Sequence, residues 1–273
     1  FFGTLLRDSA RVIVLSTPHR ARLLTQDPGI EEKSVILPPP PLIRFCTDSP
    51  DVARQQAREV LGAGPDDFVW VYWGYIYPGK GVETLLRAFR IVSQRNCNAR
   101  LALVGGNLEI PNRKCNDYFQ MVQRLPGILG IADKVIWTGN FNWDSDEGSR
   151  YLYAADACVL PFDYGVTLNS SSLAAASTHG VPVIGTELRV GRDEMLEHGH
   201  NIYLCPPRNP ELLAEAMQLI SENSDFRDRL RSGICDLADQ WHRWDAMTAH
   251  MIEILESAVS CEKARERGQS HSY

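Results

Sequence analysis

The sequence predicts an α/β protein with a Rossmann-like parallel sheet and helices on both faces of that sheet. Short apolar runs rich in β-branched and aromatic residues alternate along the chain with longer segments of helical periodicity, which is the pattern of βαβ units. Several of these runs end in glycine, as strands do where the chain must turn sharply. The chain has 273 residues, of which 44% are apolar and 23% are charged. This length and composition are enough to bury a substantial core.

The alternation is clearest in the middle of the chain. Phe68–Trp73 is apolar on both alternating sets of positions, as expected for a strand covered on both faces. A helix is expected over Val82–Gln94, where apolar residues recur at helical spacing. The expected elements that follow are a strand Arg100–Val104, a helix near Asn116–Leu125, a strand Val135–Thr138, a helix near Asp146–Ala154, a strand Ala157–Leu160, a helix near Ser171–Thr178 and a strand Val181–Ile184.

The flanking segments suggest how the domains are divided. A strand Ala10–Leu15 and a helix reaching Arg22 come before Val35–Leu37, which runs into four prolines, a stiff connector. Amphipathic helices are expected downstream, over Pro210–Glu222, Phe226–Ala238 and Trp241–Ala258, before a polar end at Cys261–Tyr273 that is expected to fray. We therefore expect residues 1–41 to be the remnant of a preceding domain with its Pro-rich connector, residues 42–240 to be the main domain, and residues 241–273 to be a helix and tail.

Composition excludes several classes of function. The net charge of −6 gives no reason to expect nucleic acid as a partner. Seven cysteines are scattered singly, without a Cys-x-x-Cys pair, which argues against a disulfide framework or a zinc site. No apolar run approaches the roughly 20 residues that cross a bilayer. A cytoplasmic location is expected, with peripheral attachment to a membrane as an option.

Metal sites are not favoured by the acidic and histidine residues. Asp144 and Asp146 form the type of acidic pair that can hold a divalent cation, but an acidic helix start explains them more simply. His198 and His200 have no further metal ligands near them in the sequence. We expect no metal and no cofactor.

Two loops have the composition of anion-binding sites. In Gly74–Gly81, a lysine flanked by glycines, Lys80, lies between a strand and the first turn of a helix, where free N–H groups and the helix dipole attract phosphate. In Pro161–Leu173, Ser171 and Ser172 stand at a helix start, where serine either caps the helix or binds phosphate. A third turn ends at Glu194, whose carboxylate can also simply complement a helix dipole.

A series of short motifs follows the predicted strands in order. They are Gly74-x5-Lys80-Gly81, Leu103-Val-Gly105-Gly106, Val135-x-Trp137-Thr-Gly139, Tyr153-Ala-Ala-Asp156 before Pro161, Gly180-Val-Pro-Val-Ile-Gly-Thr186, and Asn201–Ala216. The series resembles the C-terminal, nucleotide-sugar-binding half of retaining GT-B-fold glycosyltransferases, known as group 1 or family 4. The order of the motifs is more specific than any one of them, and the resemblance runs from about Phe68 to Trp244.

This resemblance implies a set of roles for individual residues. The diphosphate of a nucleotide sugar would contact Gly74, Lys80, Ser171 and Ser172; the nucleoside would lie against Gly105, Gly106, Trp137 and Gly139; and the donor sugar would lie near Asp163, Asn169 and Glu194. Transfer would be metal-independent and would retain the anomeric configuration. The acceptor, a glycan, a lipid or a small molecule, would be held by the N-terminal domain, of which we expect only the last part in this sequence, so the resemblance assigns no catalytic residue here.

The chain departs from the family pattern at two places. Tyr75 stands where an arginine commonly follows the first glycine, and Thr167 and Ala175 stand where the family carries two glutamates. Ser171-Ser172-Leu173 is similar to the Gly-Ser-Leu sequence of a related subgroup. A degenerate protein that binds a nucleotide sugar or glycan without transfer is therefore an alternative, and so is a nucleotide-sugar epimerase. A dinucleotide dehydrogenase is disfavoured because Gly-x-Gly-x-x-Gly is missing.

Overall fold

A computed structural model describes residues 2–108, 112–142 and 144–269. Its main sheet has six strands in the order β5-β4-β3-β6-β7-β8, and every pair of neighbours is parallel. The strands are β3 (Phe68–Trp73), β4 (Ala99–Val104), β5 (Val135–Gly139), β6 (Ala157–Leu160), β7 (Val183–Thr186) and β8 (Tyr203–Cys205). The predicted α/β fold with a parallel sheet is thus confirmed.

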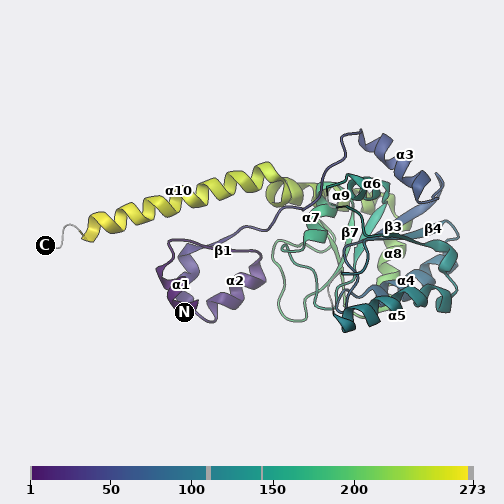
Figure 1. The fold of residues 1–273 in the computed structure, drawn as a ribbon, viewed down its shortest axis with the longest axis horizontal. Coiled ribbons are helices and arrows are strands. Elements are labelled where there is room, and N and C mark those ends of the chain that lie inside the picture. Colours follow the sequence, from purple (N-terminus) through teal and green to yellow (C-terminus); the bar gives the residue numbers. More distant parts are fainter. Residues whose placement is uncertain (1, 109–111, 143, 270–273) are drawn as a thin grey trace.

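Helices cover both faces of this sheet (Figure 1). On one side lie α4 (Val82–Arg95), α5 (Arg113–Leu129) and α8 (Pro210–Glu222). On the other side lie α3 (Pro50–Val60), α6 (Glu147–Ala154), α7 (Ser171–Thr178) and α9 (Ser224–Leu237). The core runs through the middle strands, where Val69, Trp70 and Val71 are fully buried, because a parallel sheet with helices on both faces leaves neither side of its strands to solvent.

Glycines let the ends of β3 and β4 meet closely. Gly105 has φ +118°, and a Cβ there would lie 2.4 Å from the carbonyl oxygen of Gly74. Gly74 itself has φ +127° and faces the Ser172 hydroxyl, 3.0 Å from where its Cβ would be. Only glycine combines this backbone conformation with so close an approach, so the strand ends and the start of α7 form one compact edge.

Several elements differ from the sequence-based expectation. β7 begins at Val183 rather than Val181, because Pro182 has no N–H to donate and contributes only its carbonyl, which accepts from Cys158 N at 2.8 Å. α3, capped by the Ser49 hydroxyl, and the three-residue strand β8 were not expected. β8 is too short to show an alternating pattern.

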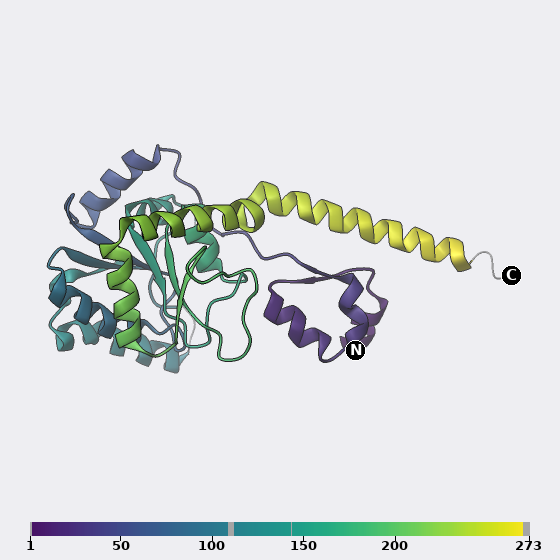
Figure 2. The same cartoon turned by 180° about the vertical axis from the view of Figure 1, so that it is seen from behind.

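The segment before the main sheet forms a small unit of its own. Its two strands, β1 (Val12–Val14) and β2 (Ser34–Ile36), form a parallel sheet. The other elements of the unit are α1 (Phe2–Asp8), α2 (Thr17–Leu24) and a 3-10 turn (Pro28–Lys33). In Figure 2 this unit lies beside the main domain and below the long C-terminal helix. Arg11 Nε donates to Ser257 Oγ at 3.0 Å, which ties the unit to that helix.

The C-terminal helix is longer than predicted. A 3-10 turn (Ala132–Lys134) precedes β5, and a short π-helical stretch (Ala238–His242) leads into α10 (Trp244–Gln269), which extends well beyond the main domain (Figure 1). Cys261–Gln269 is therefore helical rather than frayed, and residues 270–273 lie outside the described part. Within the described residues, no helix is both long and apolar enough to cross a membrane.

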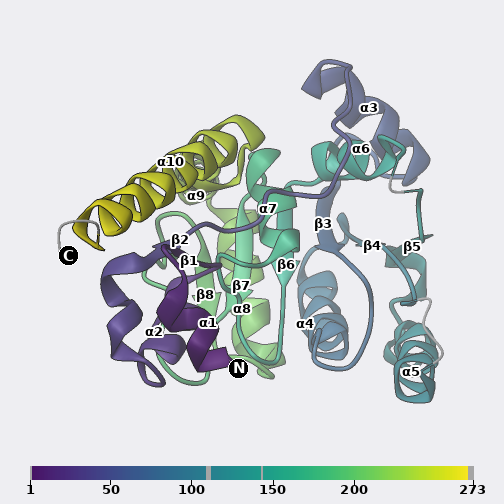
Figure 3. The same ribbon diagram turned by 60° about the vertical axis from the view of Figure 1, so that its left-hand side comes forward.

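Residues 37–49, which we call the connector, join β2 to α3 without helix or strand. This agrees with the extended segment predicted from its four prolines. Figure 3 shows the connector passing along α7 and α6 before it reaches α3.

Candidate functional site

A cavity of about 390 Å³ lies where β3, β4 and β5 end and α7 begins. We call it the Lys80 cavity. The carboxyl ends of parallel strands are where open α/β sheets bind ligands. It is lined by Leu42, Ile43, Trp73, Gly74, Tyr75, Tyr77, Lys80, Gly105, Asn140, Phe141, Ser171, Ser172 and Ala175. Five of the sequence-predicted site residues are therefore brought together: Gly74, Lys80, Gly105, Ser171 and Ser172.

Lys80 is a half-buried cation held by aromatic rings. Its Nζ lies 4.0 Å from the centroid of the Phe162 ring and 5.2 Å from that of Tyr77. Across residues 2–108, 112–142 and 144–269, no carboxylate forms an ion pair with it. Burial lowers the pKa of Lys80 from 10.5 to about 8, because the charged ammonium loses water that no anion replaces. Among the described residues, the site thus presents a positive charge without a negative partner.

The start of α7 faces this cation with unused hydrogen-bonding groups. The Ser170 hydroxyl caps the helix by accepting from Leu173 N at 3.3 Å. Ser171 and Ser172 both line the cavity and, within the described residues, make no side-chain hydrogen bond. Because the capping role belongs to Ser170, these two hydroxyls and the helix-start amides are available to an anion.

The glycines expected around a nucleoside stand at the ends of β4 and β5. Gly105 N donates to Thr138 Oγ1 at 3.3 Å, and Gly105 forms a β-bridge with Gly139, whose φ is +72°. Gly106 lies tightly against Asn140, whose Oδ1 would be 2.4 Å from a Cβ on that glycine. Trp137 lies in β5, and its ring packs edge-on against Phe119 of α5, at 6.2 Å between centroids. Of the four residues expected around the nucleoside, Gly105 lines the Lys80 cavity, whereas Gly106, Trp137 and Gly139 do not.

Asp163 and Asn169, expected near the donor sugar, lie in the loop between β6 and α7 but do not line the cavity. The buried Asp163 carboxylate accepts from Arg208 Nη2 at 2.6 Å through Oδ2, whereas Oδ1 is buried without a hydrogen-bond partner. This contact raises the pKa of the Arg208 guanidinium. The Asp163 backbone N–H donates to Gly79 O at 2.9 Å, so Asp163 holds the loop beside Lys80.

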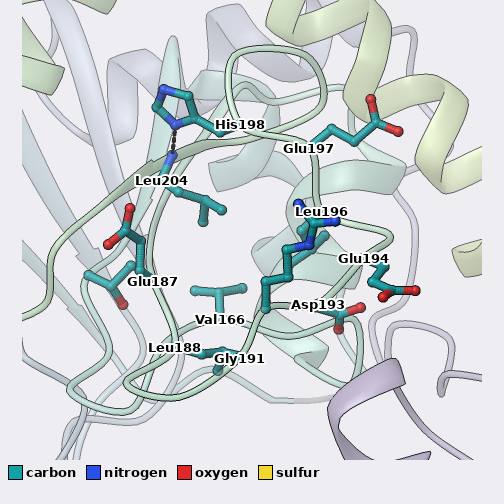
Figure 4. A pocket seen from close by; sticks show the side chains of 12 residues that line it. Val166, Glu187, Leu188, Gly191, Asp193, Glu194, Leu196, Glu197, His198 and Leu204 are labelled. Atoms are coloured by element: carbon teal, nitrogen blue, oxygen red, sulfur yellow. Dashed lines mark hydrogen bonds between the residues drawn. The ribbon is translucent and has the colours of Figure 1, made fainter. Parts of the chain in front are cut away.

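Glu194 lines a second, larger cavity of about 650 Å³, at the ends of β7 and β8 (Figure 4). Glu187, Glu197 and His198 share this cavity, and His198 Nδ1 accepts from Leu204 N at 3.0 Å. The buried Asp193 forms part of its wall.

Asp193 links this wall to two other parts of the chain. Its carboxylate accepts from Leu168 N at 2.7 Å and from the Thr17 hydroxyl at 2.8 Å. Leu168 belongs to the loop before α7, and Thr17 is the first residue of α2. The wall is thus joined to the small N-terminal unit.

Metal-binding groups do not converge in the described part of the chain, where no three His, Cys, Asp or Glu side chains are placed to hold an ion together. Asp146 pairs with Arg150 at 3.0 Å, and this contact lowers the pKa of the carboxyl. Asp144 pairs with Arg44 at 3.5 Å. Both aspartates thus have basic partners.

Some cavity residues were not found by sequence reasoning. Asn140 and Phe141 directly follow β5, and their position after a strand end was an available signal. Leu42 and Ile43 come from the connector, far from the other lining residues in sequence, and nothing in the local pattern marks them. Tyr77 also lies in the glycine–lysine loop, where its contact with Lys80 depends on the loop conformation.

Comparison with curated proteins gives relatives of low identity. The chain is 25% identical over 251 residues to the mannosylfructose-phosphate synthase of Agrobacterium fabrum, covering 91% of this chain and 53% of that protein. It is 28% identical over 221 residues to a GDP-mannose-dependent phosphatidylinositol monomannoside mannosyltransferase of Mycobacterium tuberculosis, covering 78% and 52%. The chain thus spans about half the length of these relatives.

Solved structures share the fold. The sucrose-phosphate synthase of Thermosynechococcus elongatus superposes with a TM-score of 0.72 at 21% identity, over 94% of this chain and 60% of that one. The Anabaena protein HepE, solved with UDP and glucose, superposes with a TM-score of 0.71 at 20% identity, over 93% and 65%. At such identities the likeness shows a common architecture. The model of one family, described as glycosyl transferases group 1, matches residues 67–223, more than half of the chain, and the chain belongs to that family.

Proposed function

We propose that the chain binds a nucleoside-diphosphate sugar in the Lys80 cavity and takes part in transferring the sugar to an acceptor. The observation that carries this proposal is the half-buried Lys80 ammonium, which shares a cavity with Ser171 and Ser172 and, within the part of the chain that the structure describes, has no carboxylate partner. A diphosphate carries the charge that would restore the lost solvation of Lys80 and accept hydrogen bonds from Ser171 and Ser172. A relative solved with UDP and UDP-glucose is consistent with such a donor.

Transfer would proceed through electrostatic stabilisation of the leaving group. As the bond from sugar to diphosphate breaks, negative charge grows on the departing phosphate oxygens, and a fixed cation and fixed N–H dipoles stabilise it without reorganising. Metal-independent transfer with retention of configuration is part of this proposal. Ala175, which replaces a family glutamate, lines the cavity with a methyl group, so carboxylate contacts to the donor would have to come from elsewhere.

The donor and the acceptor are proposed to bind to different parts of the protein. Residues 42–240 form the donor-binding domain, and residues 1–41 belong to the domain that would hold a glycan, lipid or small-molecule acceptor. Glu194 faces the second cavity next to the contact between Asp193 and Thr17, so we place the reacting sugar on that side. Asp163 and Asn169 would then act through the loop that separates the two cavities. A cytoplasmic setting, with the option of peripheral attachment to a membrane, remains our proposal.

The experiment is an NMR assay of the chain with UDP-glucose and with GDP-mannose, each ¹³C-labelled in the sugar, without an added acceptor. Slow release of the sugar to water, first seen as the α anomer, supports retaining transfer. Epimerised sugar still attached to the nucleotide would instead identify an epimerase. Binding without turnover here and across a panel of acceptors favours the degenerate binding protein. If neither nucleotide sugar binds, the proposal is wrong.

A further inference from the structure

The connector forms one wall of the Lys80 cavity, although its lining residues lie about 25 positions before β3 in the sequence. Leu42 and Ile43 line the cavity together with Trp73 and Phe141. Leu42 is 82% exposed, so its side chain is accessible to a ligand in the cavity that it lines.

The lining of the cavity combines an apolar group and a polar group of side chains. The Trp73 and Phe141 rings lie 5.3 Å apart, and both crowd Gly148 of α6, where a Cβ would be within 3.0 Å of either ring. The connector docks on the next residue of α6, Ser149. The apolar group therefore consists of Leu42 and Ile43 of the connector and these two rings, backed by α6, whereas Lys80 and the α7 serines form the polar group.

A chain of hydrogen bonds anchors the connector. Cys46 N donates to Ser149 Oγ at 3.0 Å, and Ser149 Oγ lies 2.7 Å from His179 Nε2. His179 Nδ1 lies 2.7 Å from the carbonyl oxygen of Ala175, so the neutral ring donates there and accepts from the Ser149 hydroxyl. Burial supports this assignment, since it lowers the pKa of His179 to about 4. The anchor thus ends at Ala175, which itself lines the cavity.

Ring stacking adds a second anchor at the same place. The Phe45 ring stacks on the His179 imidazole, with 4.9 Å between centroids and an interplanar angle of 10°. Tyr153 of α6 contacts the other side of the site, edge-on to the same imidazole at 4.9 Å. Phe45 follows Leu42 and Ile43 by two to three residues, close enough to fix the position of their backbone.

We propose that the connector reads the nucleoside end of the donor: Leu42 and Ile43 pack against the nucleoside, and Phe45, seated on His179, is the residue that positions them. This inference rests on the proposed function, because the proposed function places the diphosphate at Lys80. The nucleoside then packs against Trp73, Phe141 and the connector, since these residues supply the apolar lining and Lys80 is the one charged residue among those that line the cavity. Apolar and aromatic walls suit the faces of a base.

The test compares two probes, UDP and inorganic pyrophosphate, by titration calorimetry of the whole chain. Leu42→Ala should weaken UDP binding about threefold and Phe45→Ala about fivefold, on the scale of a lost apolar contact. Binding of pyrophosphate should stay within about twofold of wild type, because pyrophosphate contacts only the polar group of Lys80 and the α7 serines. Phe45→Tyr keeps the stacked ring and should bind UDP with wild-type affinity.

Matched variants separate the possible outcomes. Arg44→Ala alters the same connector at a side chain that is 64% exposed and pairs with the exposed Asp144, and it should leave both probes unaffected. Lys80→Ala should weaken both probes. The inference is wrong if Leu42→Ala and Phe45→Ala bind UDP with wild-type affinity. It is also wrong if both variants weaken the affinities for UDP and for pyrophosphate by the same factor. In either case the proposed diphosphate site is unaffected. If wild type binds neither probe, the proposed function itself fails. Truncating the exposed Leu42 leaves the fold intact, so this variant decides even if Phe45→Ala is unstable.

Discussion

At the residue scale, Lys80 carries most of the functional argument. Its position between two glycines was predicted from the sequence, but its isolation from carboxylates and its contact with the Phe162 ring appear only in the structure. Sequence spacing reports which groups stand near a strand end. It does not report burial or pairing, because these depend on which loops the fold brings together.

The lowered pKa of Lys80 predicts that UDP binding depends on pH. With a pKa of about 8 in the empty site, the ammonium is largely charged at pH 7 and largely neutral at pH 9.5. Since the anion binds the charged form, affinity should be nearly constant below pH 7.5 and fall about tenfold per pH unit well above pH 8. Calorimetry across this range measures the effect. Lys80→Arg, which stays charged, should flatten the profile; an equally steep fall in that variant would contradict the assignment.

Neighbouring serines of α7 are expected to have separable roles. Ser170→Ala removes the helix cap and should lower the free energy of unfolding by about 1 kcal/mol. Ser172→Ala removes a hydroxyl that has no partner in the described protein, so it should leave stability unchanged and weaken UDP binding several-fold. Urea unfolding and calorimetry on both variants check this separation. The account of the site would be contradicted if Ser172→Ala bound UDP normally.

At the scale of elements, the close meeting of the glycine–lysine loop with the end of β6 is the most constrained feature. Gly81 has φ +65°, and a Cβ there would lie 1.9 Å from the carbonyl oxygen of Pro161. Gly81→Ala must therefore displace backbone, and we expect a loss of about 3 kcal/mol or more in unfolding free energy. Gly62→Ala is the matched control, since Gly62 has φ +61° but nothing within 4 Å of its Cβ position. A similar loss in both variants would show that φ alone accounts for the cost.

The sequence predicts long, strongly patterned elements better than short ones. β3 and α4 carry enough apolar residues at a defined period to be recognised, and both were predicted within a residue or so. β8 has three residues and owes its place to pairing with β7, a long-range contact without a local signal. α3 was not expected, although Ser49-Pro50 is a regular helix start and gives a local signal for it.

At the scale of the whole molecule, the buried His242 and the half-buried His179 couple folding to pH. His242 contacts the Ser177 hydroxyl at 2.7 Å through Nδ1, and burial lowers its pKa to about 4, as it does for His179. Both folded pKa values lie below the 6.5 of an exposed histidine, so the unfolded chain binds protons more tightly. Their contribution to stability is present above pH 6.5 and is lost as the pH falls toward 4.

Urea unfolding at pH 7 and pH 5 measures this coupling. By pH 5 each histidine should cost the folded state on the order of 1–2 kcal/mol. His179→Gln should remove its share of the pH dependence. His19→Gln, at an exposed position, should not. An unchanged pH dependence in His179→Gln would contradict the neutral state of that ring.

The arrangement of the site across the whole chain could be predicted only in part. The Lys80 cavity assembles residues that the motifs marked, because strand ends of a parallel sheet lie at one edge. The connector wall and the separation of Glu194 into a second cavity arise from the paths of loops over the surface. Those paths are fixed by contacts such as Cys46 with Ser149 and Asp193 with Thr17, which are distant in sequence.

The central claim is that Lys80 binds the diphosphate of a nucleotide donor, and titration calorimetry with UDP at pH 7 tests it most directly. Wild type should bind, Lys80→Ala should bind about tenfold or more weakly, as expected for a lost charge-assisted contact, and Lys114→Ala, at an exposed lysine of α5, should match wild type. Equal affinities of wild type and Lys80→Ala would contradict the claim.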